Sequence, residues 1–88
     1  MKLNENFALR QVADFWVVLP LGEKTLEFSG MINLNDTGAM LWQLLEKGYE
    51  KEDLVKALTK EYDVSEQQAL TDIEEFIDKL TLAGCLQA

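Results

Sequence analysis

The chain has 88 residues, 48% of them hydrophobic and 27% charged, which is the composition of a globular protein rather than a disordered one. This length predicts one domain over residues 1–88, burying roughly 60 to 65% of the surface that the unfolded chain exposes. Sixteen acidic residues against eight basic ones give a net charge of −8, which argues against nucleic acids and anionic membranes as partners.

The first predicted elements are strands. Residues 7–12 and 15–19 are rich in aromatic and β-branched side chains and flank Ala13 and Asp14, a pattern that predicts a hairpin with a tight turn. After a turn at residues 20–24, residues 26–34 return as a third strand. Ser29 and Gly30 predict a bulge or bend within this strand.

The third strand runs directly into a helix. Asn35 is the predicted N-cap, and Asp36 lies in the first turn, where the helix dipole favours a negative charge. The helix continues to about Lys47 and ends at Gly48. Its buried side is formed by Leu41, Trp42, Leu44 and Leu45.

Two more helices follow. Residues 50–61 place Leu54, Leu58 and Tyr62 at fourth-residue spacing, with charged side chains on the solvent side. Ser65 and Gln68 predict a capping box at the start of the third helix, which ends where Gly84 can take the left-handed cap conformation. The apolar stripe of this helix consists of Ala69, Ile73, Phe76, Ile77 and Leu80.

Three antiparallel strands followed by three helices on one face of the sheet make an α+β fold. The second and third helices also match the length and spacing of a helix-turn-helix, a motif usually associated with DNA. A recognition helix that reads DNA is basic, whereas the third helix carries five acidic residues and one lysine, so a DNA-binding function is disfavoured. These residues are Glu66, Asp72, Glu74, Glu75, Asp78 and Lys79.

The residues that carry enzyme chemistry are scarce. The chain has no histidine, which removes the usual general base and the commonest zinc ligand, and its single cysteine, Cys85, is predicted to be an inert, buried thiol. Glu74 and Glu75 are sequence neighbours that point to different sides of a helix, so they do not converge as an acid and a base. We therefore predict a protein that is not an enzyme and binds no cofactor and no metal.

The localisation is predicted from apolar runs. Residues 1–6 contain no apolar segment of a signal peptide, and no run in the sequence approaches the roughly 20 apolar residues of a membrane helix. We expect a cytoplasmic protein.

The third strand is a candidate binding element, because an exposed strand edge offers unpaired amides and carbonyls to an extended peptide. The candidate edge spans residues 28–33. The third helix has two apolar flanks. One flank has to cover the first and second helices, and the remaining flank is then available to line a groove beside the strand. The flanks are Phe76, Leu80 and Ala83 on one side and Leu70 and Ile77 on the other, with Asp72 and Lys79 at the rim.

The segment LNDTGAMLWQLLEKG, followed by EDLVKALTKEYDVSEQQALTDIEEFIDKLTLAGCL, resembles the PqqD family, whose type member acts in pyrroloquinoline quinone synthesis. The likeness covers residues 7–86. It rests on the Leu-Asn-x-Thr-Gly start, the tryptophan one turn later, the Leu-x-x-x-Tyr-x-Val-Ser run and the terminal Leu-x-x-x-Gly-x-Leu. The first strands are the least distinctive part.

The resemblance implies a winged helix-turn-helix-like domain that binds the leader of a ribosomally made, modified peptide instead of DNA. The leader lies as an added strand on the third strand, beside the third helix, and the domain presents the precursor to a peptide-modifying enzyme, which in many members is a radical SAM protein. The chain resembles the stand-alone form. The implied peptide-binding residues are Phe28, Ser29, Gly30, Met31, Ile32, Asn33, Asp72, Ile73, Phe76, Lys79, Leu80 and Ala83.

Other interpretations remain open at this point. Phe76, Ile73 and Leu80 fit a purely structural core, as do Trp42 and Tyr62. The same strand edge also fits a structural module that pairs with a second copy of itself, giving a homodimer, because edge pairing looks identical in sequence. A winged-helix DNA-binding protein is the third alternative.

Overall fold

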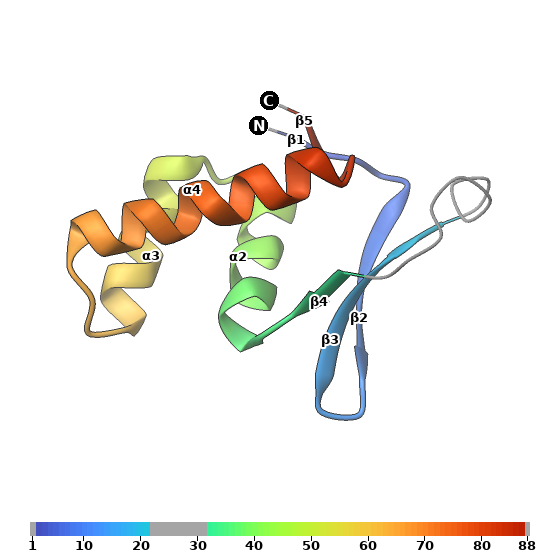
Figure 1. Ribbon diagram of the computed structural model, residues 1–88, viewed down its shortest axis with the longest axis horizontal. Coiled ribbons are helices and arrows are strands. Elements are labelled where there is room, and N and C mark those ends of the chain that lie inside the picture. The colour runs from blue at the N-terminus through green and yellow to red at the C-terminus, as the bar shows by residue number, and fades with distance from the viewer. Residues whose placement is uncertain (1, 22–31, 88) are drawn as a thin grey trace.

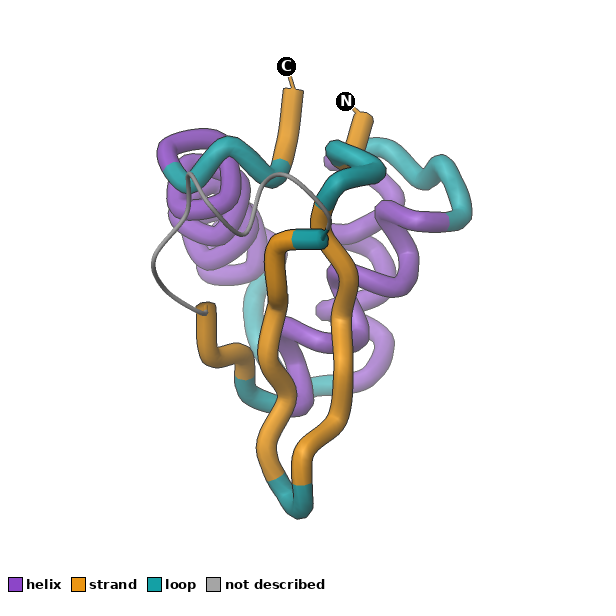
Figure 2. The backbone as a smooth tube through the Cα atoms, turned by 90° about the vertical axis from the view of Figure 1, so that its right-hand side faces the viewer, coloured by secondary structure: helices purple, strands orange, loops and turns teal. Residues whose placement is uncertain are grey.

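The computed structural model of the chain describes residues 2–21 and 32–87. The elements in chain order are β1 (Lys2–Leu3), β2 (Phe7–Val12), β3 (Phe15–Pro20), β4 (Ile32–Leu34), α2 (Asp36–Glu46), α3 (Lys51–Glu61), α4 (Glu66–Leu82) and β5 (Leu86–Gln87). β2, β3 and β4 form an antiparallel sheet in that order, and the three helices lie on one side of the β2-β3 hairpin (Figures 1 and 2). The predicted α+β architecture is confirmed.

The hairpin forms where the sequence predicted it. Val12 pairs with Phe15 across a two-residue turn, and Ala13 takes a left-handed conformation (φ 55°) that suits the tight turn. Of the predicted third strand, residues 32–34 are in β4, and residues 26–31 lie outside the described residues.

The first helix begins directly after β4, as predicted. The Asn35 side-chain oxygen accepts a hydrogen bond from the Gly38 amide at 2.8 Å and so caps α2. A Cβ atom at Gly38 would lie 3.2 Å from the Cβ of Leu34. Glycine at this position therefore allows the first turn of α2 to lie close against β4.

The starts of the other two helices differ in one detail from expectation. The Glu50 amide donates to the Asp53 carboxylate at the start of α3, and the Ser65 hydroxyl accepts from the Gln68 amide at the start of α4. The Gln68 side chain does not reach back to Ser65. It donates instead to Asp72 one turn later, at 2.9 Å, so only the serine half of the predicted capping box forms.

The core lies between the sheet and the helices. Trp42 (1% exposed), Leu54 and Leu58 are buried there, as predicted. The prediction that Tyr62 belongs to the core is wrong, because this residue is 40% exposed. Tyr62 is the C-cap of α3 and has extended backbone angles, so its side chain leaves the buried stripe of the helix.

A second, two-stranded sheet was not predicted. β1 pairs with β5, Lys2 opposite Gln87 and Leu3 opposite Leu86, and the Asn4 amide donates to the Cys85 carbonyl at 2.8 Å. Strands of two residues have no periodicity that a sequence pattern can reveal. This pairing brings the two ends of the described chain side by side (Figure 1).

Candidate functional site

β4 is an edge strand of the sheet. It pairs with β3 in the register Trp16 to Leu34, Val17 to Asn33 and Val18 to Ile32, and no described strand pairs with its other edge. In an antiparallel ladder successive residues direct their backbone groups alternately to the two sides, so part of the amides and carbonyls of β4 face outward. α4 lies on the side of the sheet where β4 is the edge (Figures 1 and 2).

This short strand is held by core packing on one face and by the start of α2 at its end. The side chains of Ile32 and Leu34 are buried in the core, while Asn33 between them is exposed. The indole Nε1 of Trp16 donates to the Asp36 carboxylate at 3.2 Å and thereby joins β3 to the first turn of α2. The backbone edge of β4 is therefore fixed before any partner arrives.

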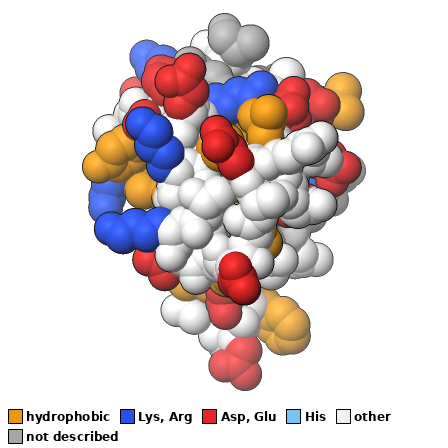
Figure 3. All heavy atoms as spheres, turned by 90° about the vertical axis from the view of Figure 1, so that its left-hand side faces the viewer, with side chains coloured by type: hydrophobic (Ala, Val, Ile, Leu, Met, Phe, Trp, Pro, Cys, Tyr) orange, Lys and Arg blue, Asp and Glu red, His pale blue; other side chains and the backbone are white. Residues whose placement is uncertain are grey.

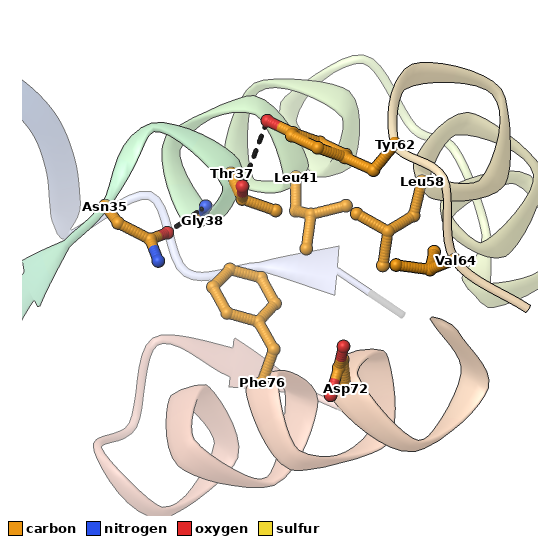
Figure 4. A pocket seen from close by; sticks show the side chains of 9 residues that line it. All are labelled: Asn35, Thr37, Gly38, Leu41, Leu58, Tyr62, Val64, Asp72 and Phe76. Atoms are coloured by element: carbon orange, nitrogen blue, oxygen red, sulfur yellow. Dashed lines mark hydrogen bonds between the residues drawn. The ribbon is translucent and has the colours of Figure 1, made fainter. Parts of the chain in front are cut away.

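A pocket of about 370 Å³ opens where β4 ends (Figure 4). It lies between the N-terminal turn of α2, the C-terminal end of α3 and the middle of α4. The residues that line it are Asn35, Thr37, Gly38, Leu41, Leu58, Tyr62, Val64, Asp72 and Phe76.

The pocket combines apolar walls with a few polar groups. The Phe76 ring and the Asp72 carboxylate point from α4 toward α2 and α3, and Leu41 and Leu58 lie opposite them (Figure 4). The Thr37 hydroxyl donates to the Tyr62 hydroxyl at 3.0 Å across the rim. A mostly apolar pocket with a few placed polar groups is the usual form of a ligand site.

The predicted site residues divide into three groups. Ile32 and Asn33 are on the β4 edge, and Asp72 and Phe76 line the pocket. Lys79, which is exposed, lies on α4 beyond the pocket lining, and Ala83, which is half-buried, is the C-cap of this helix.

The second group is buried, and the third lies outside the described residues. Ile73 and Leu80 are fully buried (0% exposed), so they belong to the core beneath the groove and do not reach a ligand in this conformation. Residues 28–31 lie outside the described residues.

Sequence reasoning missed the contributions of Asn35, Thr37 and Tyr62 to the pocket. Asn35 was interpreted only as a helix cap, and Tyr62 was assigned to the core. A usable signal was present, because the Leu-Asn-x-Thr-Gly and Tyr-x-Val-Ser pieces both contribute lining residues. Their convergence is visible only in three dimensions, where the Thr37–Tyr62 hydrogen bond joins positions 25 residues apart.

The thiol of Cys85 does not line this pocket. Cys85 is buried, and desolvation raises the pKa of its thiol to about 11, so it is neutral and unreactive at physiological pH. Among residues 2–21 and 32–87, no group of three or more His, Cys, Asp or Glu side chains is placed to hold a metal ion. No helix in this part of the chain has the length and hydrophobicity that crossing a membrane requires.

The fold and the pocket define a small α+β domain with an open strand edge beside a helix. A family model described as coenzyme PQQ synthesis protein D (PqqD) matches residues 16–86. This match covers most of the chain, and the chain belongs to the PqqD family. No curated protein matches it.

Two solved structures are similar over the whole chain. TbiB1 in complex with the TbiA(β) leader peptide is 26% identical, with a TM-score of 0.84, and the match covers 100% of this chain and 96% of TbiB1. A lasso peptide synthetase B1 complexed with its leader peptide is 28% identical, with a TM-score of 0.82, and the match covers 99% of this chain and 96% of that one.

Proposed function

We propose that this protein binds the leader segment of a ribosomally synthesised precursor peptide and presents the precursor to a modifying enzyme. The leader adds as a strand to the outer edge of β4, with α4 as the second wall of the groove. The observation that carries the proposal is the open β4 edge leading to the pocket of Figure 4. Two similar proteins, each solved with a leader peptide, support it.

The β4 edge suits this role because its conformation is fixed in advance. Ile32 and Leu34 anchor the strand in the core, and Asn35 ends it in a helix cap, so little ordering is needed when a peptide pairs with it. Main-chain hydrogen bonds supply affinity that tolerates many sequences. Phe76 and the neighbouring pocket supply selectivity for side chains.

The partner enzyme supplies the chemistry in this proposal. Family resemblance favours a radical SAM enzyme or another peptide-modifying enzyme, acting in the cytoplasm. The domain itself acts as a peptide chaperone. Purified protein incubated alone with the precursor should leave the peptide mass unchanged, and a modified peptide formed without a second enzyme would contradict this role.

The DNA-binding alternative is disfavoured by the surface of α4. Its Glu66, Asp72, Glu74, Glu75 and Asp78 side chains are all exposed, and such a surface repels phosphates. The homodimer alternative uses the same β4 edge as the leader. Size measurement with and without a leader peptide separates the two, because a self-paired edge predicts a dimer that the peptide dissociates.

The proposal is tested by titrating isotope-labelled protein with a synthetic leader. Candidate leaders come from short open reading frames beside the gene of this protein. Amide shifts are expected to cluster in residues 28–34 and along residues 72–83. Shifts confined to residues 51–60 on α3 would show that the peptide docks elsewhere and that the β4 edge is only structural.

A further inference from the structure

We propose that the pocket of Figure 4 receives a long basic side chain, lysine or arginine, of the bound leader. The inference rests on the proposed function, because it assigns a class of side chain to the pocket at the end of the β4 edge. It adds a specificity that strand pairing by itself does not provide, since main-chain hydrogen bonds do not discriminate between side chains.

Charge complementarity is the first observation. Among the described residues that line the pocket, Asp72 is the one that carries a charged side chain at neutral pH. Its carboxylate points into the pocket (Figure 4). Its hydrogen bond comes from the neutral amide of Gln68, at 2.9 Å. No lysine or arginine of the described residues pairs with it, so the carboxylate is available to a cation from a ligand.

The shape and chemistry of the walls are the second observation. Phe76 and Val64, both half-buried, offer apolar surface to the methylene stem of a long side chain, while the cationic end remains at the partly solvated rim. Leu41 and Leu58 lie beneath them and are nearly buried. The rings of Phe76 and Tyr62 add favourable surroundings for a cation. A glutamate or aspartate would meet the same walls with a repulsive charge at the rim.

The charge of the whole chain acts in the same direction. With a net charge of −8, the protein attracts cationic segments from solution. On the face of the molecule drawn in Figure 3, acidic side chains are spread from top to bottom, whereas most Lys and Arg side chains lie in its left and upper parts. The net negative charge favours any basic peptide, wherever its basic residues lie. The Asp72 carboxylate favours a basic residue at one position of the peptide, the one that enters the pocket, and a test can separate these two effects.

The test is a selection of short random peptides displayed on phage against the protein and two variants. Asp72→Asn removes the pocket charge. Asp78→Asn is the matched control, because it changes the net charge equally on the same helix but lies outside the pocket lining. Wild type and Asp78→Asn should enrich Lys or Arg at one fixed position of an apolar pattern, and Asp72→Asn should keep the apolar pattern without this enrichment.

One selected peptide then gives a quantitative readout by fluorescence anisotropy. Replacing its basic residue by norleucine, which keeps an aliphatic stem, should weaken binding roughly two- to fivefold to wild type and Asp78→Asn, as for a partly exposed ion pair, and should change nothing for Asp72→Asn. An equal loss in all three proteins, or no positional enrichment, would overturn the inference while leaving strand addition intact. If no peptide is selected, or labelled protein shows shifts only outside the β4-α4 groove, the proposed function fails and the inference with it.

Discussion

The sheet has two outer edges, and they differ in what surrounds them. β4 is a short edge strand on the side of α4, and it runs directly into the residues that line the pocket. β2 is twice as long, but none of its residues lines that pocket, and its last three residues are exposed. Every open sheet has free edges. The comparison teaches that a second wall and a side-chain pocket, rather than the free edge itself, distinguish a candidate peptide site.

The largest expected difference between the two edges comes from proline. Asn33→Pro in β4 and Gln11→Pro in β2 both replace exposed side chains, so both act through the backbone. Proline lacks the amide hydrogen and bends a strand, and at Asn33 it removes either the pairing with a peptide or the pairing of β4 with β3. We expect Asn33→Pro to abolish leader binding.

Gln11→Pro is the control on the opposite edge. It should weaken the hairpin but retain binding once affinity is corrected for the folded fraction measured by circular dichroism. Equal loss of binding in folded samples of both variants would remove the distinction between the edges.

The next prediction separates the pocket from the core beneath it. Phe76 and Ile77 are neighbours on α4, and both are partly buried against the core, but only Phe76 lines the pocket. Either change to alanine should lower the free energy of unfolding by about 2 to 4 kcal/mol. Phe76→Ala should in addition weaken leader binding about tenfold or more, whereas Ile77→Ala should leave the affinity of the folded protein nearly unchanged.

Chemical denaturation and a binding titration on the same samples check this prediction. A parallel loss of affinity in the two variants would mean that α4 contributes only through stability and that the pocket is not used.

The fold was predictable wherever a local pattern dictated the structure. The hairpin follows from the aromatic and β-branched residues on both sides of Ala13 and Asp14, and the helix starts follow from Asn35 and Ser65. The pairing of β1 with β5 depends on contacts between the two ends of the described chain, and a two-residue strand carries no pattern of its own. Local patterns thus predict elements, but not the pairings that distant contacts decide.

The candidate site was only partly predictable for a related reason. Phe76 and Asp72 were placed at the groove by family resemblance, and both line the pocket. Ile73 and Leu80 share the apolar stripe of the same helix, but the packing of α4 turns them fully into the core. Tyr62 follows the helical spacing of Leu54 and Leu58, yet the chain leaves the helix at this residue and brings its hydroxyl to Thr37.

A smaller effect is expected from the helix caps. Asn35 caps α2 and lines the pocket, whereas Ser65 caps α4 and does not line it. Each change to alanine should lower stability by about 1 kcal/mol, because it leaves a helix amide without its side-chain acceptor. Thermal denaturation should therefore show similar losses, while only Asn35→Ala weakens leader binding, by disturbing the junction between β4 and α2. Weaker binding in Ser65→Ala as well would indicate a general effect of helix fraying.

The smallest effect is expected at the tip of the hairpin. Val12 and Phe15 face each other across the turn and are 57% and 69% exposed, so they are the apolar residues of β2 and β3 that solvent reaches most. Because these side chains bury little surface, the double variant Val12→Ser/Phe15→Ser should change the free energy of unfolding by less than about 0.5 kcal/mol per site.

The double variant should also leave leader affinity unchanged, since the leader is proposed to pair with β4 and to reach a pocket that neither residue lines. Anisotropy with the same labelled leader used for the other variants provides the measurement, and Phe76→Ala provides the positive control for a loss of binding. A clear loss of affinity in a fully folded double variant would show that the peptide extends past Asn35 onto the hairpin, and the contrast between the two edges would then have to include the tip that joins β2 to β3.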